Sequence, residues 1–491
     1  MKYLFLIILI LLVVASIGIY LSMPAAKSDV PVLYWVTDGN PARKQQIEIF
    51  HQWMIKRGYT TDDGRPACEM RIDVINRDRS KMVIQGLSGM GGDILDAVPG
   101  DMPYFQALGL LEDVTELGLR LGFDPSHTYK AIESDLCIDG RQYAFPCNVY
   151  VHMYWVNVET FRRYGLKPPP RRWTFDEFEE RGREFVQKAN SPGKPRTAFF
   201  TNNVDIRVLM RSMGLSIYNE TLTRCTLDDP RAARCAERLY KWIYEDHLIP
   251  TKAESDSFAA TSDYGGLDMH LFHSGQYAMI KYGRYGLIRF RQFGEMELVV
   301  VESPHGGFPV AETGTRAACI YHGGKYKDLA AYFLEYLASE DYNMQIVRDA
   351  DALPPNPEYT RCEAFLRPSS FPGEEGCHEV FAEAAKNIAI SKAYSPFILG
   401  SVADRYLFKA YDRVMNRLAN AEAAFQQTTK LINKTIDRNI NEDDSLKQRY
   451  DRLMARQKEI DILKANHQKI PAQLIENPFH KRYYESLGLL E

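Results

Sequence analysis

The residues best suited to chemistry lie in one short loop, Tyr282 to Tyr285, where an aromatic ring, a glycine, a guanidinium and a second aromatic ring follow one another. The compact apolar run Tyr277 to Ile280 predicts a buried strand before this loop, and Gly283 ends that strand and presents Arg284 and Tyr285. A planar cation beside an aromatic face suits a polar ligand with one apolar side, such as a sugar ring. An ordinary surface turn explains the same residues equally well.

The usual sequence marks of catalysis are missing. No GxSxG, HExxH, P-loop or GxGxxG pattern occurs in the chain. His270 and His273 are one helical turn apart and could both reach a metal, but the sequence offers no third ligand nearby, which favours a solvated helix face. Asp228 and Asp229 precede Pro230, a pattern typical of a helix start, where acids stabilise the helix dipole. We therefore expect no catalytic residue, no metal and no cofactor.

Aromatic side chains are the positive signal. The chain contains 29 tyrosines, and several tyrosines and tryptophans fall at predicted strand ends or in loops beside Asn, Asp or Arg. Each position alone is better explained as core or surface, but their occurrence at strand ends in both halves of the chain favours ligand stacking. These positions are Trp35, Tyr104, Tyr150, Tyr154, Tyr282 and Tyr285.

The elements that must position these residues begin with a β-α-β-α-β pattern. Apolar, β-branched runs predict strands over residues 31–36, 70–75 and 93–98, and helical periodicity predicts the helices between them. This order is typical of a parallel sheet with crossover helices. Ligands bind such sheets beyond the carboxyl ends of the strands, so we expect the loops 37–40 and 99–101 to face one cleft.

Further along, Asp139-Gly140 predicts a hairpin turn, and an alternating aromatic strand is expected over residues 150–156. Thr174 and Glu177 form a capping box at the start of a helix in the second half. The polar stretch 421–470 predicts a helical hairpin, interrupted at residues 441–444, that packs on the body of the protein or on a partner.

Composition and the N-terminal segment limit the possible cellular locations and binding partners of the protein. The 491 residues carry a net charge of -4, which argues against nucleic acid as a partner. Residues 3–23 are almost entirely apolar, with Lys2 before them and Lys27 after them, and about 21 residues are long enough to cross the ~30 Å hydrocarbon core of a membrane. We expect an uncleaved signal anchor, and a cleaved signal peptide is the alternative.

Eight cysteines form an even set without a CxxC motif. An exported location would permit disulfides, and the loops between Cys225 and Cys235 and between Cys362 and Cys377 contain turn residues. These two local pairs are therefore the candidate disulfides. Buried free thiols are an equally good interpretation of the same cysteines.

Six phrases of this sequence resemble the extracellular solute-binding proteins of ABC transporters, the family that includes maltose-binding protein. They cover residues 32–40, 91–114, 140–166, 171–185, 272–286 and 330–355, and the most specific are GRQYAFPCNVYVHMYWVNVETFRRYGL and FHSGQYAMIKYGRYG. The resemblance implies an α/β fold of two lobes, the type II-like periplasmic-binding-protein fold, joined by a hinge. The lobes of such proteins close on a ligand, and the membrane permease recognises the closed form.

The resemblance also implies a ligand site, with Tyr285 as the stacking platform. Two departures are notable: Arg284 stands where the family often has a small residue or proline, so an anionic ligand becomes conceivable, and the tail after residue 421 extends beyond the family's usual end. Carried over position by position, the ligand-binding residues are Thr37, Asp38, Asn40, Gly100, Asp101, Asn148, Tyr150, Tyr282, Gly283, Arg284 and Tyr285.

From the residues and this resemblance we expect five regions: a signal anchor and linker (1–28), the first part of lobe 1 (29–160), lobe 2 (161–310), crossing segments with the remaining helices (311–420), and a helical C-terminal extension (421–491). The expected function is that of the substrate-binding component of an ABC importer. It would bind a sugar or oligosaccharide, deliver it to the permease subunits, and be tethered to the cell membrane on the periplasmic or extracellular side. The alternative is a membrane-tethered sensor or scaffold protein with the same two-lobe fold.

Overall fold

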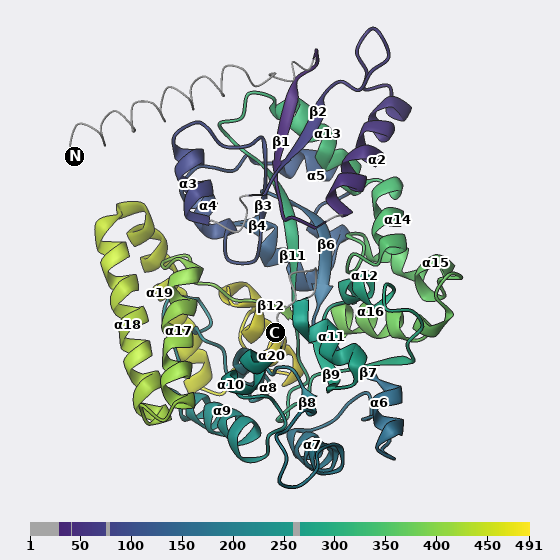
Figure 1. Ribbon diagram of the computed structural model, residues 1–491. Helices are drawn as coiled ribbons and strands as arrows, with labels where there is room; N and C mark the ends of the chain where they lie inside the picture. Colours follow the sequence, from purple (N-terminus) through teal and green to yellow (C-terminus); the bar gives the residue numbers. More distant parts are fainter. Residues whose placement is uncertain (1–28, 41, 75–78, 259–265) are drawn as a thin grey trace, which may run out of the picture.

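The computed structural model describes residues 29–40, 42–74, 79–258 and 266–491 (Figure 1). The predicted anchor over residues 3–23 lies outside these described residues. Within the described ranges, no helix is both long enough and apolar enough to cross a membrane.

Lobe 1 is built on a six-stranded sheet that confirms the predicted β-α-β-α-β start. The strands β1, β2 and β3 are parallel, and the long strand β11 runs antiparallel to β3 and β6 and parallel to β12. All ten residues of β11 are buried, because strands lie on both sides of it and helices cover it. The bounds are β1 Val32–Val36, β2 Glu69–Asp73, β3 Ile94–Ala97, β6 Phe145–Val151, β11 Ala311–Ile320 and β12 Ala389–Ser391.

Lobe 2 is built on a second sheet of four strands in the order β10-β7-β9-β8. The strand β9 pairs antiparallel with β7 and parallel with β8, so that β9 lies in the middle of the sheet and delivers its carboxyl end to the loop at residues 283–285. The bounds are β7 Met153–Asn157, β8 Phe199–Thr201, β9 Tyr277–Tyr282 and β10 Leu298–Val301.

The chain passes from one sheet to the other at a single residue, His152. The sequence predicts one strand over residues 150–156, but the structure has two: β6 ends at Val151 in the first sheet and β7 begins at Met153 in the second. The buried residues of both strands continue one apolar pattern, so the pattern could not show the change of sheet. The chain therefore enters lobe 2 before residue 160, and it returns to lobe 1 between β10 and β11.

Local signals in the sequence form the expected turns and caps. Asp139 and Gly140 both adopt positive φ angles, 51° and 77°, in the turn between β4 (Cys137–Ile138) and β5 (Arg141–Gln142). Thr174 and Glu177 form the predicted capping box at the start of α7. The turn and the helix start therefore lie where the sequence predicts them.

Helices cover both sheets and are distributed between the lobes (Figure 1). In the first half they are α2 Ala42–Arg57, α3 Arg79–Leu87, α4 Met102–Ala107, α5 Thr115–Leu121, α6 Val158–Arg163, α7 Phe175–Ala189, α8 Ile206–Ser212 and α9 Pro230–Tyr240. In the second half they are α10 Lys252–Ser257, α11 Gly266–Ser274, α12 Leu287–Phe290, α13 Lys327–Ala338, α14 Glu340–Asp349, α15 Glu363–Leu366, α16 Cys377–Asn387 and α17 Gly400–Met415.

The C-terminal extension forms the predicted helical hairpin. Helix α18 (Ala421–Glu442) ends one residue before Asp443, whose side chain caps α19 (Asp444–Ala465), and α20 (Pro478–Ser486) follows. Ile432, Ile436 and Ile440 of α18 are buried in the same hydrophobic cluster as residues of α9 and α17. The hairpin thus packs on lobe 2, where α17, α18 and α19 form one flank of the molecule (Figure 1).

The two candidate disulfides are not formed. Cys225, Cys235, Cys362 and Cys377 are all free thiols in the structure. The physical reason is that their thiols face different partners: Cys225 Sγ contacts Thr429 Oγ1 of α18, Cys362 Sγ donates to the Tyr359 carbonyl oxygen, and Cys377 Sγ donates to the Leu298 carbonyl oxygen. Turn residues between two cysteines do not determine where the thiols point.

Candidate functional site

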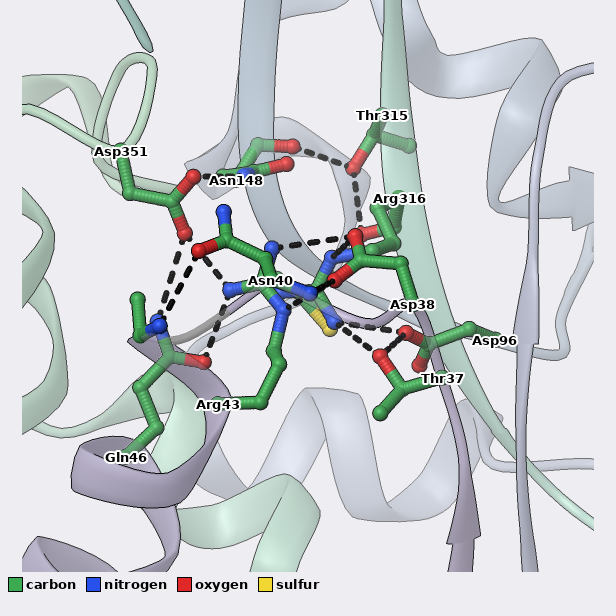
Figure 2. Close-up of polar contacts among 12 residues, drawn as sticks. Thr37, Asp38, Asn40, Arg43, Gln46, Asp96, Asn148, Thr315, Arg316 and Asp351 are labelled. Carbon is green, nitrogen blue, oxygen red and sulfur yellow. Dashed lines mark hydrogen bonds and ion pairs between the residues drawn. The ribbon is translucent and has the colours of Figure 1, made fainter. Parts of the chain in front are cut away.

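The loop after β1 takes part in a buried polar network at the carboxyl ends of the lobe 1 strands (Figure 2). Thr37 Oγ1 donates a hydrogen bond to Asp96 Oδ2, and Arg316 Nη1 lies 2.6 Å from the same oxygen. Thr37 and Asp96 are fully buried, and Arg316 is 7% exposed. Asp96 thus holds the β1 loop and β11 together, and the Thr37 hydroxyl is occupied inside the protein.

The same network continues to helix α2. The Arg43 guanidinium bonds Asp38 (Nε to Oδ1, 2.9 Å) and Asp351 (Nη1 to Oδ2, 2.7 Å), and Asn148 Nδ2 donates to the other oxygen of Asp351 at 3.2 Å. Asn40 accepts a hydrogen bond from the Ala42 amide at the start of α2. Asn40 thus holds the backbone at the start of α2 through its amide oxygen, and Asn148 holds Asp351 through its amide nitrogen.

Asp38 is the member of this network that reaches the surface. Its side chain is 32% exposed, whereas the side chains of Arg43 and Asp351 are almost completely buried. Burial raises the pKa of Asp38, but the Arg316 and Arg43 guanidinium groups outweigh it and hold that pKa at about 2. Asp38 is therefore a fixed, partly exposed carboxylate.

The loop after β3 is held by Asp101 and shaped by Gly100. Asp101 accepts a hydrogen bond from the Val98 amide at 3.1 Å and pairs with Arg79 Nε at 3.1 Å, while burial raises the pKa of Asp101. Gly100 has a φ of 96°, and a Cβ placed there would lie 2.8 Å from the ring of Tyr394. Only glycine lets the loop approach that ring so closely.

In lobe 2 the structure brings Tyr282 and Tyr285 together around Gly283. The two rings lie 4.8 Å apart, and a Cβ on Gly283 would lie 2.3 Å from the Tyr285 ring, so glycine is required between them. The Gly283 carbonyl accepts a hydrogen bond from Trp155 Nε1 at 3.1 Å. The Tyr285 hydroxyl lies 3.1 Å from His152 Nε2, at the crossing between the sheets.

Arg284 is a correction to the sequence prediction. It is 1% exposed, and its guanidinium donates to the carbonyl oxygens of Ala352 (2.8 Å) and Val347 (3.0 Å) and to His378 Nδ1 (2.9 Å). Burial lowers the pKa of Arg284 to about 9. The guanidinium stabilises the end of α14 inside the protein and is not presented to a ligand, which removes the reason to expect an anionic solute.

A cluster of charged side chains around Glu312 of β11 was missed by the sequence analysis. Glu312 Oε1 lies 3.4 Å from His152 Nδ1 and 3.3 Å from Lys392 Nζ. Burial raises the pKa of Glu312, but His152, Lys281 and Lys392 outweigh it and hold that pKa well below its ordinary value. The position of these residues relative to the strands could have indicated the cluster. His152 links two strands, Lys281 lies near the end of β9, and Lys392 follows β12 directly.

The cluster extends into lobe 2 through Arg207. Its guanidinium pairs with Asp205 at 3.4 Å and with Asp404 at 3.0 Å. Lys281 lowers the pKa of Asp205, which burial alone would raise. Lys281, Lys392 and Arg207 thus face the carboxylates of Glu312, Asp205 and Asp404, and a fourth cation, the buried Arg211, lines the same cavity and donates to the Ile390 and Ser391 carbonyl oxygens.

Two cavities border this cluster, with volumes of about 30 and 110 Å³. Lys392, Ala393 and Tyr394 line both of them. Tyr150 stacks on His152, with ring centroids 4.9 Å apart, and closes the other side of the cluster. The arrangement offers aromatic rings, hydroxyl groups, an imidazole and paired charges; among the described residues, no group of three or more His, Cys, Asp or Glu side chains could hold a metal.

Solved structures with the same fold align with this chain over nearly their whole length. The ABC substrate-binding protein Lmo0181 from Listeria monocytogenes, in complex with cycloalternan, is 17% identical with a TM-score of 0.69, over 83% of this chain and 100% of that one. The sugar-binding protein MalE from Xanthomonas citri is 13% identical with a TM-score of 0.66, over 83% and 98%. UgpB from Mycobacterium tuberculosis, in complex with glycerophosphocholine, is 14% identical with a TM-score of 0.65, over 84% and 100%.

At the level of sequence, a search of curated proteins finds no match. Residues 77–344, more than half of the chain, match the family described as bacterial extracellular solute-binding protein. The two-lobe fold, with loops from both sheets around one charged and aromatic cluster, agrees with that match. This chain belongs to the bacterial extracellular solute-binding protein family.

Proposed function

We propose that this protein is the substrate-binding component of an ABC importer, which binds a sugar or oligosaccharide between its lobes and delivers it to the membrane permease. The observation that carries the proposal is the contact between His152 and Tyr285. It joins the crossing between the sheets to the loop after β9, among aromatic rings and paired charges.

A sugar fits the chemistry of this cluster. Its apolar C–H face stacks on an aromatic ring such as Tyr285 or Tyr150, and its hydroxyl groups pair with fixed charged groups through charge-assisted hydrogen bonds. The cations Lys281, Lys392 and Arg207 face nearby carboxylates, and Arg211, which lines the same cavity, donates to two backbone carbonyl oxygens, so these cationic groups already have partners inside the protein. A neutral solute rich in hydroxyl groups is therefore the best match.

Closure of the lobes would be the signal that the permease reads. The chain crosses between the sheets at His152, and a bound solute that contacts both lobes stabilises the closed arrangement by its differential affinity for that state. A solute that bound the open and closed forms with equal affinity would not change their populations, so the permease would receive no signal. Glu312 is the second residue of β11 and Lys392 directly follows β12, so both lie beside the segments that join the two lobes.

We further propose that residues 3–23 anchor the protein in the cell membrane, with the lobes on the periplasmic or extracellular side. The almost entirely apolar run, which is long enough to span the hydrocarbon core, supports this proposal. The alternative of a scaffold that uses the C-terminal helices to bind a partner is less favoured. The apolar face of α18 is already buried against lobe 2.

A binding screen tests the proposal. The full chain, with its anchor in detergent, is titrated with maltose, maltotetraose, cycloalternan and glycerophosphocholine while its thermal unfolding is followed. A true ligand at 100 times its dissociation constant stabilises the folded state by about 2.7 kcal/mol. We expect stabilisation by at least one carbohydrate and none by an anionic hexose phosphate. If no carbohydrate stabilises the protein, the proposed substrate class is wrong.

A further inference from the structure

The C-terminal extension (residues 421–491) packs behind one wall of the cleft. This wall, which we call the cleft-wall segment, is Lys392–Leu399 and connects β12 to α17. Asn439 Nδ2 of α18 donates a hydrogen bond to the Phe397 carbonyl oxygen at 3.0 Å. The ring of Tyr450 from α19 meets the Phe397 ring edge to face, with centroids 5.1 Å apart. Two helices of the extension thus hold one residue of the segment.

The extension also contacts the other parts of the molecule that meet at the cleft. Arg449 of α19 pairs with Asp139 in the β4–β5 turn of lobe 1 at 3.2 Å. Phe479 of α20 is fully buried and clusters with Val310, directly before β11, and Ile390 of β12. The extension therefore touches lobe 1, lobe 2 and the strands between them, and any movement of the lobes changes its contacts.

Tyr394 is the residue of the cleft-wall segment that enters the cleft. A Cβ on Gly100 would lie 2.8 Å from its Cδ2 and Cε2 atoms, and a Cβ on Gly400 would lie 2.7 Å from its Cδ1 and 2.8 Å from its Cε1. One glycine of lobe 1 and one at the start of α17 thus clamp the two edges of the ring. Such close approach is possible only where both residues lack a side chain.

The hydroxyl of Tyr394 is placed to meet a solute. Across the described part of the chain, the structure gives it no hydrogen-bond partner, and the charged residues Arg207, Glu312 and Asp404 line the smaller cavity together with Tyr394. The ring lines both cavities of the cleft. A hydroxyl group held in this position can donate to one sugar oxygen and accept from another.

We infer that the C-terminal extension positions Tyr394 for solute binding, with Asn439 and Tyr450 acting through Phe397. This inference rests on the proposed function, because it assigns a task to the cleft that the proposal identifies. Without the extension, the Phe397 carbonyl loses its donor and the Phe397 ring loses its neighbour. The cleft-wall segment would then lose two of the contacts that fix Phe397, three residues after Tyr394, and the clamp on Tyr394 would loosen.

Two asparagines on α18 provide a matched test. Asn439 bonds the cleft-wall segment, whereas Asn433 accepts a hydrogen bond from the Cys225 amide at 2.9 Å, in a loop of lobe 2 that is not part of that segment. Both substitutions, Asn439→Ala and Asn433→Ala, remove one side-chain bond to the backbone, so both should lower stability to a similar extent. Only Asn439→Ala should affect Tyr394.

The readout is the fluorine NMR signal of 3-fluorotyrosine placed at position 394 alone in the full chain. The fluorine lies on the clamped edge of the ring, so its chemical shift reports the clamp. We expect the signal in Asn439→Ala to broaden or to move toward the value of a solvent-exposed tyrosine, and the signal in Asn433→Ala to stay unchanged. Identical signals in the two variants would overturn the inference.

A second pair of variants tests whether the contact between the Tyr450 and Phe397 rings, and not only the presence of the extension, positions Tyr394. Tyr450→Phe keeps the ring contact with Phe397 and should leave the fluorine signal unchanged. Tyr450→Ala removes that contact and should shift the signal as Asn439→Ala does. A shift of equal size in Tyr450→Phe and Tyr450→Ala would contradict the assigned route through the ring.

Calorimetric titration with maltotetraose links the clamp to binding. We expect Asn439→Ala to weaken maltotetraose binding about five- to tenfold, which is the effect of about one lost hydrogen bond, and Asn433→Ala to leave it unchanged. Equal affinities would overturn the link to binding. If the unmodified chain binds no member of the carbohydrate panel, the proposed function fails, and the fluorine signals alone decide whether the extension positions Tyr394.

Discussion

The buried carboxylate of Glu220 should fasten the C-terminal extension to lobe 2, and its removal should release that extension. Glu220 lies in the loop between α8 and α9, is 4% exposed, and accepts hydrogen bonds from Lys464 Nζ (2.8 Å), Gln457 Nε2 (2.9 Å) and the Tyr484 hydroxyl (2.5 Å). These donors come from α19 and α20. In Glu220→Gln the amide cannot accept all of these bonds, and Lys464 loses the charge that it faces.

The size of the effect follows from the pKa of Glu220. Burial raises that pKa, but His480 and Lys464 outweigh it and hold it at about 2 in place of the ordinary 4.5. At about 1.36 kcal/mol per pKa unit, this difference corresponds to about 3 kcal/mol. Removal of one partner from a buried ion pair costs about 3–5 kcal/mol in other proteins, which is the same range. We therefore expect Glu220→Gln to destabilise the docked extension by about 3 kcal/mol at pH 7.

Native-state hydrogen exchange is the appropriate assay, because it resolves the opening of α19 and α20 from the unfolding of the lobes. The matched control is Glu237→Gln. Glu237 pairs with Arg417 at 2.9 Å, but both side chains are nearly half exposed, so its loss should cost less than about 1 kcal/mol. Equal effects of Glu220→Gln and Glu237→Gln on the extension would refute the reasoning.

The same pair predicts a pH dependence with a definite sign. Because the folded-state pKa of Glu220 is lowered, its contribution to stability is present above about pH 4.5 and is lost as the pH falls toward 2. The difference between the unmodified protein and Glu220→Gln should therefore shrink over that interval. A difference that stays constant between pH 7 and pH 3 would show that the carboxylate charge is not responsible.

Three further predictions concern the cleft. Tyr285→Ala should weaken carbohydrate binding at least about tenfold while leaving the fold intact, and unchanged affinity in calorimetry would remove this loop from the site. Gly100→Ala, which places a Cβ 2.8 Å from the Tyr394 ring at a φ of 96°, should push the lobes apart, and an unchanged radius of gyration in X-ray scattering would contradict this. Burial raises the pKa of Asp135 to about 7, so its stabilising effect is full below pH 4 and is lost as the pH rises through 7. Asp135→Asn should therefore raise thermal stability at pH 8 but not at pH 4, and an equal change at both pH values would disprove the role of ionisation.

Much of lobe 1 could be predicted from the sequence, because its elements carry local signals. The three parallel strands and the turn at Asp139 and Gly140 depend on residues within a few positions of one another, and so does the break between α18 and α19 at Asp443 in the C-terminal extension. Strand ends locate the loops that approach the cleft. Asp38 and Gly100 are at the predicted ends, although their roles in ligand binding stay predictions.

The features that the sequence predicted wrongly or did not reveal depend on contacts between residues far apart in the chain. Nothing near Arg284 indicates that its guanidinium reaches the carbonyl oxygens of Val347 and Ala352, more than sixty positions later. In the same way, the partners of Glu312 are about 160 positions before it (His152) and 80 positions after it (Lys392), so they could not be identified from spacing. Local patterns predict where a loop lies, and tertiary contacts decide which of its side chains face outward.

The late position of β11 in the chain has a consequence for the order of folding. In the first sheet β3 pairs with β11, so that Ala97 lies opposite Ala317 and Ile94 opposite Ile320. The roughly 220 residues between them take about 10–45 s to synthesise at about 5–20 residues per second. Lobe 1 therefore lacks a central strand of its sheet until two-thirds of the chain exists. The first sheet can therefore be completed only after all four strands of the second sheet have been synthesised.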